Sequence, residues 1–384
     1  MRLIPQDILL EIFFACLPTR HNAPIDHNEA PLLLGRICRH WREVAYSAPM
    51  LWSSIHIPPL DYILTPSNIL LRLEKIVEEW LERSATCPLS VSVYDFVNRS
   101  DPDFEPHPLI LQIAAVSRRL RSLTLAGDAD LMSPLLRLED LPRLKTLRVR
   151  TLSDQILSTD IFNLPALEDA ALCTILPASP LSLPLRWSQL TGLRLGCHGR
   201  WTEQGTEGGL DFDGALEVLR KCPNVEQCRI LISNFSESVG LPSISLPRLH
   251  TLALTGSGFQ FRDWSSDLVA PNLRFLQIGE LLFDHAPRDA HPGCLKVEID
   301  PNRFTLTSLH KFLQSFPAIS HLRLSSDMSI THPLSLDDQF IAVFCPPHNL
   351  CPMLVDIAFV GLSPGFSDGP GGALRIAGIR TSNR

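Results

Sequence analysis

The first apolar pattern of the chain is a stripe with helical spacing near the N-terminus. Ile4, Ile8 and Ile12 recur at four-residue steps, and apolar neighbours widen the stripe. Apolar side chains at three- and four-residue steps predict one face of an amphipathic helix. Pro5 fits the first turn of such a helix, because no amide donor is needed there and its φ angle is preset. We therefore expect a helix that begins near Pro5 and ends before Pro18.

A second pattern repeats through most of the remaining chain. Its unit is a Leu-x-x-Leu-x-Leu core, which often follows a Pro by two residues. The first core positions of the ten copies are Leu120, Leu144, Leu167, Leu190, Val225, Leu249, Leu273, Cys294, Ile319 and Leu354. The Leu-x-Leu part has the period of a strand with one buried face. One short strand cannot bury that face alone, so successive units are expected to stack into a parallel sheet.

The spacing of these cores resembles that of leucine-rich-repeat proteins, whose units are about 20–29 residues long. The resemblance implies an irregular solenoid over residues 89–362, in the α/β fold class. Helical periodicity in residues 213–222 and 307–316 predicts helices on its convex side. Two longer steps hold insertions, a Gly-rich polar loop at 196–214 and an excursion at 325–347.

The segments around the repeats also have readable patterns. Residues 58–88 are predicted to form a connector followed by an amphipathic helix over 68–84. Alternating residues predict a strand at 89–94, and a helix is expected at 109–119. The Ser/Pro/Gly-rich tail, 363–384, is predicted to be disordered.

Four features occur together in residues 1–57. They are an Ile-Pro pair, an Ile-Leu-x-x-Ile-Phe run, a Cys-Arg-x-Trp-Arg run and a closing Leu-Trp pair. A secretory signal is disfavoured, because Asp7 and Glu11 interrupt the apolar run and no small-residue cleavage site follows. A plain helical core is the remaining alternative, since periodicity alone cannot separate a core from a docking face.

Together these features resemble the F-box, a compact three-helix module that opens many F-box proteins of mushroom-forming fungi. The loop after the first helix is longer than in the commonest form and is expected to be a surface insertion, which costs little loop entropy. The resemblance implies that this module docks on a Skp-family adaptor. The implied adaptor-binding residues are Ile4, Pro5, Ile8, Leu9, Ile12, Phe13, Ile37, Cys38, Trp41, Leu51 and Trp52.

Composition narrows the class of protein. A net charge of −7 gives no overall electrostatic case for nucleic-acid binding. No run approaches the ~18 apolar residues that suggest a membrane span. Ten cysteines occur without a secretory signal, so reduced thiols are expected rather than disulfides. Cys87, Cys222 and Cys351 each precede a Pro where other repeats carry Leu or Phe, and they are predicted to pack as apolar side chains.

The sequence contains no recognisable catalytic motif of the Walker, His-Glu-x-x-His or Gly-x-Ser-x-Gly type. Three Asp-x-Asp pairs occur, at Asp101/Asp103, Asp128/Asp130 and Asp211/Asp213. They lie in predicted loops, where solvated carboxylates are common. Cys345, His348 and Cys351 have the residue types of zinc ligands, but a fourth ligand at zinc-finger spacing is missing. We expect no bound metal and no cofactor.

One position of the repeat has binding character. The residue between the last two core positions projects onto the outward face of the predicted sheet. Four of these residues are candidate substrate-binding residues: Arg148, Arg194, Arg229 and Arg323. With Lys145 and Arg150 nearby, they suggest a locally basic face that could hold an acidic or phosphorylated peptide. The alternative is that the long Arg side chains only cover the sheet and keep it soluble.

The F-box resemblance carries a functional expectation. It implies the substrate receptor of an SCF-type cullin–RING ubiquitin ligase, which reaches the cullin through the adaptor and holds a protein substrate on its repeats. Such a chain is not itself an enzyme and works in the cytoplasm, the nucleus or both. The alternative is a repeat scaffold that binds a partner without any ligase. The sequence does not identify the substrate, because specificity lies in side-chain detail on a shared scaffold.

Overall fold

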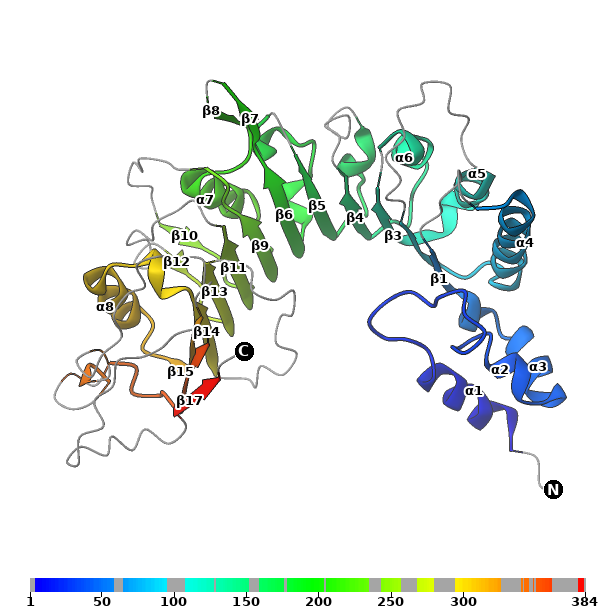
Figure 1. Ribbon diagram of the computed structural model, residues 1–384, viewed down its shortest axis with the longest axis horizontal. Helices are drawn as coiled ribbons and strands as arrows, with labels where there is room; N and C mark the ends of the chain where they lie inside the picture. The colour runs from blue at the N-terminus through cyan, green and yellow to red at the C-terminus, as the bar shows by residue number, and fades with distance from the viewer. Residues whose placement is uncertain are drawn as a thin grey trace. The chain divides into compact units, whose positions relative to one another are not determined.

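The computed structural model shows a mixed α/β protein whose main strands run parallel (Figure 1). It describes residues 4–58, 65–94, 108–127, 129–151, 159–175, 178–203, 205–234, 243–256, 268–279, 294–325, 340, 342–344, 348, 350–360 and 379–382. The chain divides into two compact units. Unit 1 comprises Met1–Ile175 and Leu183–Arg186, and unit 2 comprises Leu176–Ser182 and Trp187–Arg384. The predicted repeat region therefore spans both units.

Unit 1 begins with short helices and continues into a parallel sheet. Its described helices are α1 Gln6–Ala15, α2 Leu34–Ile37, α3 Arg39–Tyr46, η1 Pro49–Trp52, α4 Ser67–Arg83, α5 Pro108–Ala115, η2 Ser117–Arg119, α6 Ala129–Leu136 and η4 Asp160–Asn163. Its strands are β1 Ser54–Ile57, β2 Leu89–Tyr94, β3 Leu120–Ala126, β4 Thr146–Arg150 and β5 Asp169–Ile175. The strands pair in chain order, and every pair is parallel.

The core side of the unit 1 sheet is built from rows of side chains that run across the strands, with one residue from each strand in a row. One such row, aligned by the strand register, consists of Ile55, Val91, Leu123, Leu147 and Ala170. All five are at most 2% exposed. These strands alternate between buried and more exposed positions, as a sheet with one face on the core requires.

The loop that follows α1 covers the edge of this sheet. The backbone N–H of His56 donates to the carbonyl of Ala23 at 2.8 Å, and Ala23 is fully buried. The side chain of Asn22 accepts hydrogen bonds from the hydroxyls of Ser54 and Ser90. His27 and Asn28 of this insertion are exposed, as predicted. Its first part also satisfies a backbone donor on β1, which would otherwise lie at an open strand edge.

Two tryptophans join the helices of unit 1. Trp52 and Trp80 are fully buried, with ring centroids 4.9 Å apart in an edge-to-face arrangement. The Trp80 indole N–H donates to the carbonyl of Trp52 at 3.0 Å. The Trp52 indole N–H donates in turn to the carbonyl of Ala45 at 2.9 Å. These contacts fix α4 against η1 and the end of α3.

Unit 2 continues the parallel arrangement. Its main sheet has the order β6 Gly192–His198, β9 Gln227–Leu231, β11 Thr251–Thr255, β13 Phe275–Gly279, β14 Leu295–Ile299, β15 Ile319–Ser325, β16 Asp356–Val360 and β17 Ile379–Ser382. Two small sheets pair β7 Arg200–Thr202 with β8 Gly205–Glu207, and β10 Ile244–Ser245 with β12 Leu268–Val269. Its described helices are η5 Pro180–Ser182, η6 Trp187–Gln189, α7 Phe212–Lys221, η7 Pro301–Arg303 and α8 Leu306–Ser315.

The helices of unit 2 start at defined caps. The Asp211 carboxylate accepts from the backbone N–H of Gly214 at 2.7 Å and begins α7. Thr305 and Ser308 form a reciprocal capping box at the start of α8. Both helices lie on the same side of the unit 2 sheet (Figure 1). This agrees with the helices predicted at 213–222 and 307–316.

The predicted elements are largely confirmed. Each of the ten repeat cores contains or adjoins a strand, and the strand predicted at 89–94 is β2. Among the differences outside the cores, two concern the predicted loop and tail. The predicted polar loop at 196–214 contains the β7–β8 hairpin. Within the predicted disordered tail, residues 379–382 form β17, which pairs with β16.

The centre of the unit 2 sheet is closed on both faces. All five residues of β13 are buried, including Gln277 at 5% exposure. In β11 the outward Ala253 is 1% exposed. Both residues occupy the position between the last two core residues, which the sequence predicted to project onto the exposed face of the sheet. For these two residues the predicted exposure was wrong. On β4 of unit 1, by contrast, none of the outward side chains is buried.

The cysteines divide into buried and accessible thiols. Cys222 and Cys351 are buried as predicted, whereas Cys87 is half-buried. Burial raises the pKa of Cys222 and of Cys351 to about 12. Cys16 and Cys38 are exposed.

We expect a maleimide reagent to label Cys16, Cys38 and Cys173 quickly in the native protein, because these thiols are exposed. Cys222 and Cys351 are expected to react at least about tenfold more slowly, since both access and thiolate formation are suppressed. Peptide mass mapping after timed labelling measures both classes. Equal labelling rates in the folded protein would contradict this packing.

Candidate protein-binding surface

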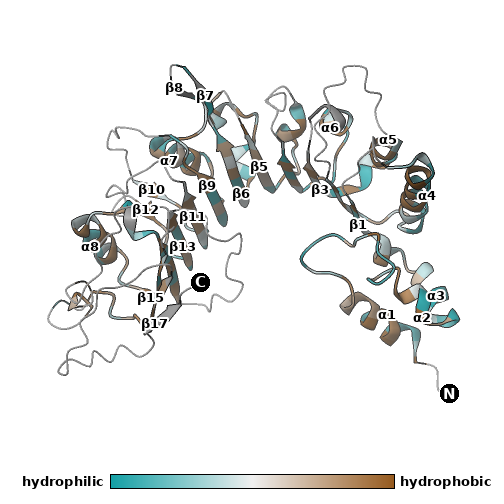
Figure 2. Ribbon diagram, in the orientation of Figure 1, coloured by the Kyte–Doolittle hydropathy of each residue, from teal (hydrophilic) through white to brown (hydrophobic). Residues whose placement is uncertain are grey.

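Helix α1 is apolar on nearly every side but is only partly buried. Ile8 is 51% exposed and Ile12 is 38% exposed, one helical turn apart. Ile4, just before the helix, is also exposed. Figure 2 shows hydrophobic residues along this helix, next to the more hydrophilic α2 and α3. A largely apolar helix is normally buried, so these exposed side chains are a candidate protein-binding surface.

The opposite face of α1 packs into unit 1. Leu9 and Phe13 are fully buried. The Phe13 ring lies 4.9 Å from the ring of Trp41 on α3, centroid to centroid. Trp41 is half-buried, so it contributes both to the packing and to the surface. This contact fixes which face of α1 points outward.

The predicted adaptor-binding residues therefore fall into two groups. The accessible group is Ile4, Pro5, Ile8, Ile12, Ile37 and Cys38, together with the half-buried Trp41. The inaccessible group is Leu9, Phe13, Leu51 and Trp52, each 0% exposed. In this structure their side chains are enclosed by the chain itself, so they are not accessible to a partner without rearrangement. They hold the surface in place instead.

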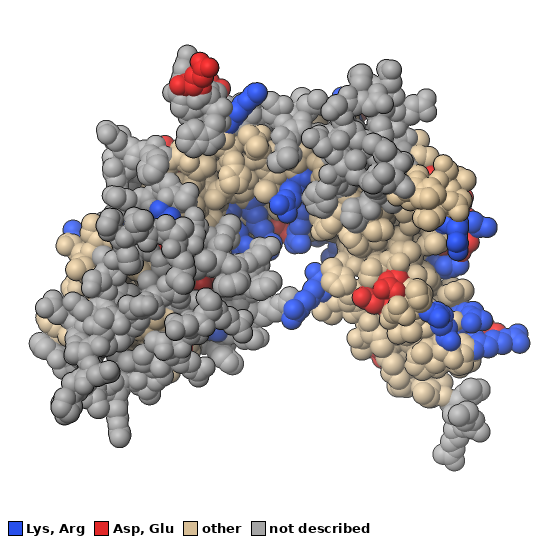
Figure 3. Space-filling model, in the orientation of Figure 1, with Lys and Arg blue, Asp and Glu red and all other residues tan. Residues whose placement is uncertain are grey.

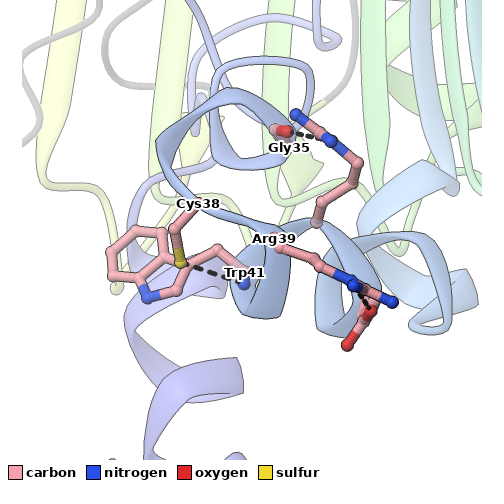
Figure 4. A network of polar contacts seen from close by, with 6 residues as sticks. Gly35, Cys38, Arg39 and Trp41 are labelled. Atoms are coloured by element: carbon pink, nitrogen blue, oxygen red, sulfur yellow. Dashed lines mark hydrogen bonds and ion pairs between the residues drawn. The ribbon is translucent and has the colours of Figure 1, made fainter. Parts of the chain in front are cut away.

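A polar network fixes α2 against α3 (Figure 4). Cys38 caps α3, and its sulfur accepts the backbone N–H of Trp41 at 3.4 Å. The Arg42 guanidinium donates to the carbonyl of Gly35 at 2.6 Å. Gly35 packs so closely that an added Cβ would lie 2.9 Å from the Tyr46 ring. The position of exposed Ile37, beside Cys38, is thereby defined.

Charges border this apolar surface. Asp7 and Glu11 lie exposed on α1, and Arg36, Arg39 and Arg42 lie exposed on α2 and α3. Figure 3 shows Lys and Arg side chains over α2 and α3. An apolar centre with a charged rim is typical of protein interfaces. Three further apolar residues here are exposed and were missed by the sequence prediction: Phe14, Leu33 and Met50. Phe14 and Met50 are sequence neighbours of the predicted Phe13 and Leu51.

The four predicted substrate-binding arginines are divided between the two units. Arg148 lies in unit 1, and the other three lie in unit 2. Arg148 pairs with Asp169 at 3.2 Å. Arg323 pairs with Glu298 at 3.3 Å, and burial raises the pKa of Glu298 while the Arg323 charge opposes that rise. Arg194 and Arg229 are in register on the neighbouring strands β6 and β9.

Two of the candidate metal ligands have a structural role in the described residues. Asp211 caps α7. The Cys351 thiol is buried and directed at the carbonyls of Leu313 and Phe316. Asp101, Asp103, Asp128 and Cys345 lie outside the described residues. Within the described part of the chain, His, Cys, Asp and Glu form no group of three or more that could hold a metal ion.

Two further observations bear on the class of protein. Across the described ranges, no helix is both long and apolar enough to cross a membrane. No model of a known protein family matches this chain, and a search of curated proteins finds no significant match.

Proposed function

We propose that this chain is the substrate-recognition subunit of an SCF-type cullin–RING ubiquitin ligase. In this proposal the helices of residues 1–57 are an F-box that docks on a Skp-family adaptor, and through it on the cullin. The parallel strands that follow are an irregular leucine-rich-repeat solenoid that binds a protein substrate. The chain performs no chemistry itself and works in the cytoplasm, the nucleus or both.

The exposed face of α1 is the observation that carries this proposal. Its apolar side chains, led by Ile8 and Ile12, are held outward because Leu9 and Phe13 anchor the other face. Because these side chains are already partly buried, covering their exposed part with a partner contributes roughly 1 kcal/mol each. A helix that presents apolar side chains in this way is a common means of docking on another protein.

The order of the parts along the chain also supports the proposal. The adaptor-binding helices and the first strands belong to one compact unit. Asn22 and Ala23 hydrogen-bond with residues of β1 and β2, so the loop between α1 and α2 is attached to the sheet. A receptor that presents a substrate to a ligase needs its two binding surfaces held on one frame, and this attachment supplies part of it.

The test is the double substitution Ile8→Asp with Ile12→Asp. It should weaken binding of a purified Skp-family adaptor about 100-fold or more, because two buried apolar contacts are lost and charges are placed in the interface. Stability should change little, since both positions are exposed. Isothermal titration calorimetry measures the affinity, and circular dichroism checks the fold.

The matched control is Ile69→Asp with Ile76→Asp on α4. These isoleucines have the same exposures as the α1 pair, 51% and 38%. The control should bind the adaptor like the unaltered chain. If both double variants bind normally, or neither the variants nor the unaltered chain binds, the F-box assignment fails and the non-ligase repeat scaffold becomes the better description.

A further inference from the structure

Two arginines stand on the outward face of β4. Arg148 and Arg150 are both exposed, and the strand alternates strictly between buried and outward side chains. Residues two apart on one strand face are separated by about 7 Å. The two guanidinium groups therefore form a pair with a spacing set by the strand itself.

The neighbouring strands leave space around this pair. In register with Arg148 are Thr124 on β3 and Ala171 on β5. In register with Arg150 are Ala126 and Cys173 on the same two strands. All four neighbours are small, so the long arginine side chains rise above them.

The charges of the pair are available to a ligand. Arg150 makes no ion pair with any other residue that the structure describes. Arg148 pairs with Asp169, but the two side chains are 45% and 27% exposed. Exposed ion pairs add little net stability, so Arg148 can exchange Asp169 for another anion at small cost.

We propose that Arg148 and Arg150 bind an extended acidic segment of a protein, with acidic side chains two residues apart. An extended chain laid along β4 repeats its side chains with the spacing of the strand, so alternate carboxylates or phosphates face the two guanidinium groups. Each guanidinium can make paired, charge-assisted hydrogen bonds to such a group. This inference rests on the proposed function and defines the class of substrate segment that the receptor takes.

Nucleic acid fits this face less well. The chain is acidic overall, with a net charge of −7, so a long polyanion is repelled away from the pair. The four flanking side chains are Thr124, Ala126, Ala171 and Cys173, which offer no aromatic ring on which a base could stack. A short acidic peptide needs neither a large basic surface nor a stacking platform.

The experiment uses the full chain and a fluorescein-labelled peptide with Asp at alternate positions in a Ser/Gly background. Fluorescence anisotropy measures its affinity. Arg148→Gln with Arg150→Gln should weaken binding about tenfold or more, since hydrogen bonds to charged groups are lost. Asp169→Asn should tighten binding a few-fold, because it removes the competing carboxylate. A phosphoserine version of the peptide shows whether phosphate is preferred to carboxylate, and either preference supports the proposal.

The matched control is Arg121→Gln with Arg143→Gln. Both residues are exposed in unit 1, and the pair removes the same total charge. We expect this control to change the affinity for the peptide by less than about twofold, because these residues are not on the outward face of β4. If the two double variants lost peptide affinity equally, the attraction would be nonspecific and the proposal would be overturned. No peptide binding, or tighter binding of a single-stranded oligonucleotide, would also overturn it.

The variant Ile8→Asp with Ile12→Asp separates this inference from the proposed function. It should bind the peptide like the unaltered chain, because its changes lie on α1. Adaptor binding without peptide binding by the unaltered chain would overturn the acidic-segment proposal alone. Peptide binding without adaptor binding would leave that proposal standing and overturn the ligase assignment.

Discussion

Replacing Trp80 with alanine is expected to lower the free energy of unfolding of unit 1 by about 3–5 kcal/mol. Trp80 is fully buried and packs edge-to-face on Trp52. Its indole N–H also donates to the Trp52 carbonyl, so the substitution leaves both a cavity and an unpaired acceptor. Urea denaturation followed by circular dichroism measures the change.

The control for this prediction is Trp187→Ala in unit 2. Trp187 is only half-buried, so the same substitution should cost less than about 2 kcal/mol. Arg83 lies over the rings of Tyr46 and Trp52, with its guanidinium carbon 4.4 and 4.8 Å from the ring centroids. We therefore expect Trp80→Ala to loosen the packing of α3 as well. Equal decreases in the free energy of unfolding for Trp80→Ala and Trp187→Ala would contradict this packing.

Gly256→Ala is the second substitution with a large expected effect, about 3 kcal/mol or more on the stability of unit 2. Gly256 follows β11 with φ +141, a conformation that L side chains rarely adopt. An added Cβ would lie 2.0 Å from the carbonyl oxygen of Ile232, which is backbone and cannot move aside cheaply. Urea denaturation should show an earlier transition for this variant.

The comparison for this prediction is Gly214→Ala in α7. Gly214 has helical backbone, and the nearest atoms to an added Cβ are side-chain atoms of Asp211 and Leu210 at 3.0 Å. The change should alter stability by no more than about 1 kcal/mol, since alanine favours the helix and offsets the tight contact. If Gly256→Ala were as mild as Gly214→Ala, the close approach of β11 to its neighbour would be wrong.

Most of the strands could be predicted because their signal is local. A Leu-x-Leu core with a period of two, repeated at regular steps, specifies a strand and its buried face together. Strand β1 was missed, although Ser54–Ile57 alternates in the same way. Its four residues lie at the end of the segment that was assigned to helices, and a single short strand has no repeat to reveal it.

Which apolar residues of the candidate site are buried could not be predicted as well from the sequence. Ile8 and Leu9 are adjacent apolar residues in one helix, yet one is half exposed and the other enclosed. That difference depends on Trp41 packing against Phe13, a contact between distant parts of the sequence. In the same way, the closed outward face at Gln277 depends on non-local coverage, which a period-two pattern does not encode.

The binding of a Skp-family adaptor is the central claim, and co-expression tests it most directly. The full chain and the adaptor should elute together in size-exclusion chromatography, with a light-scattering mass equal to one copy of each. Hydrogen exchange of the complex should show protection concentrated in α1 and around Ile37. Elution of the chain alone at 42.8 kDa, with the adaptor in a separate peak, would contradict the proposed function.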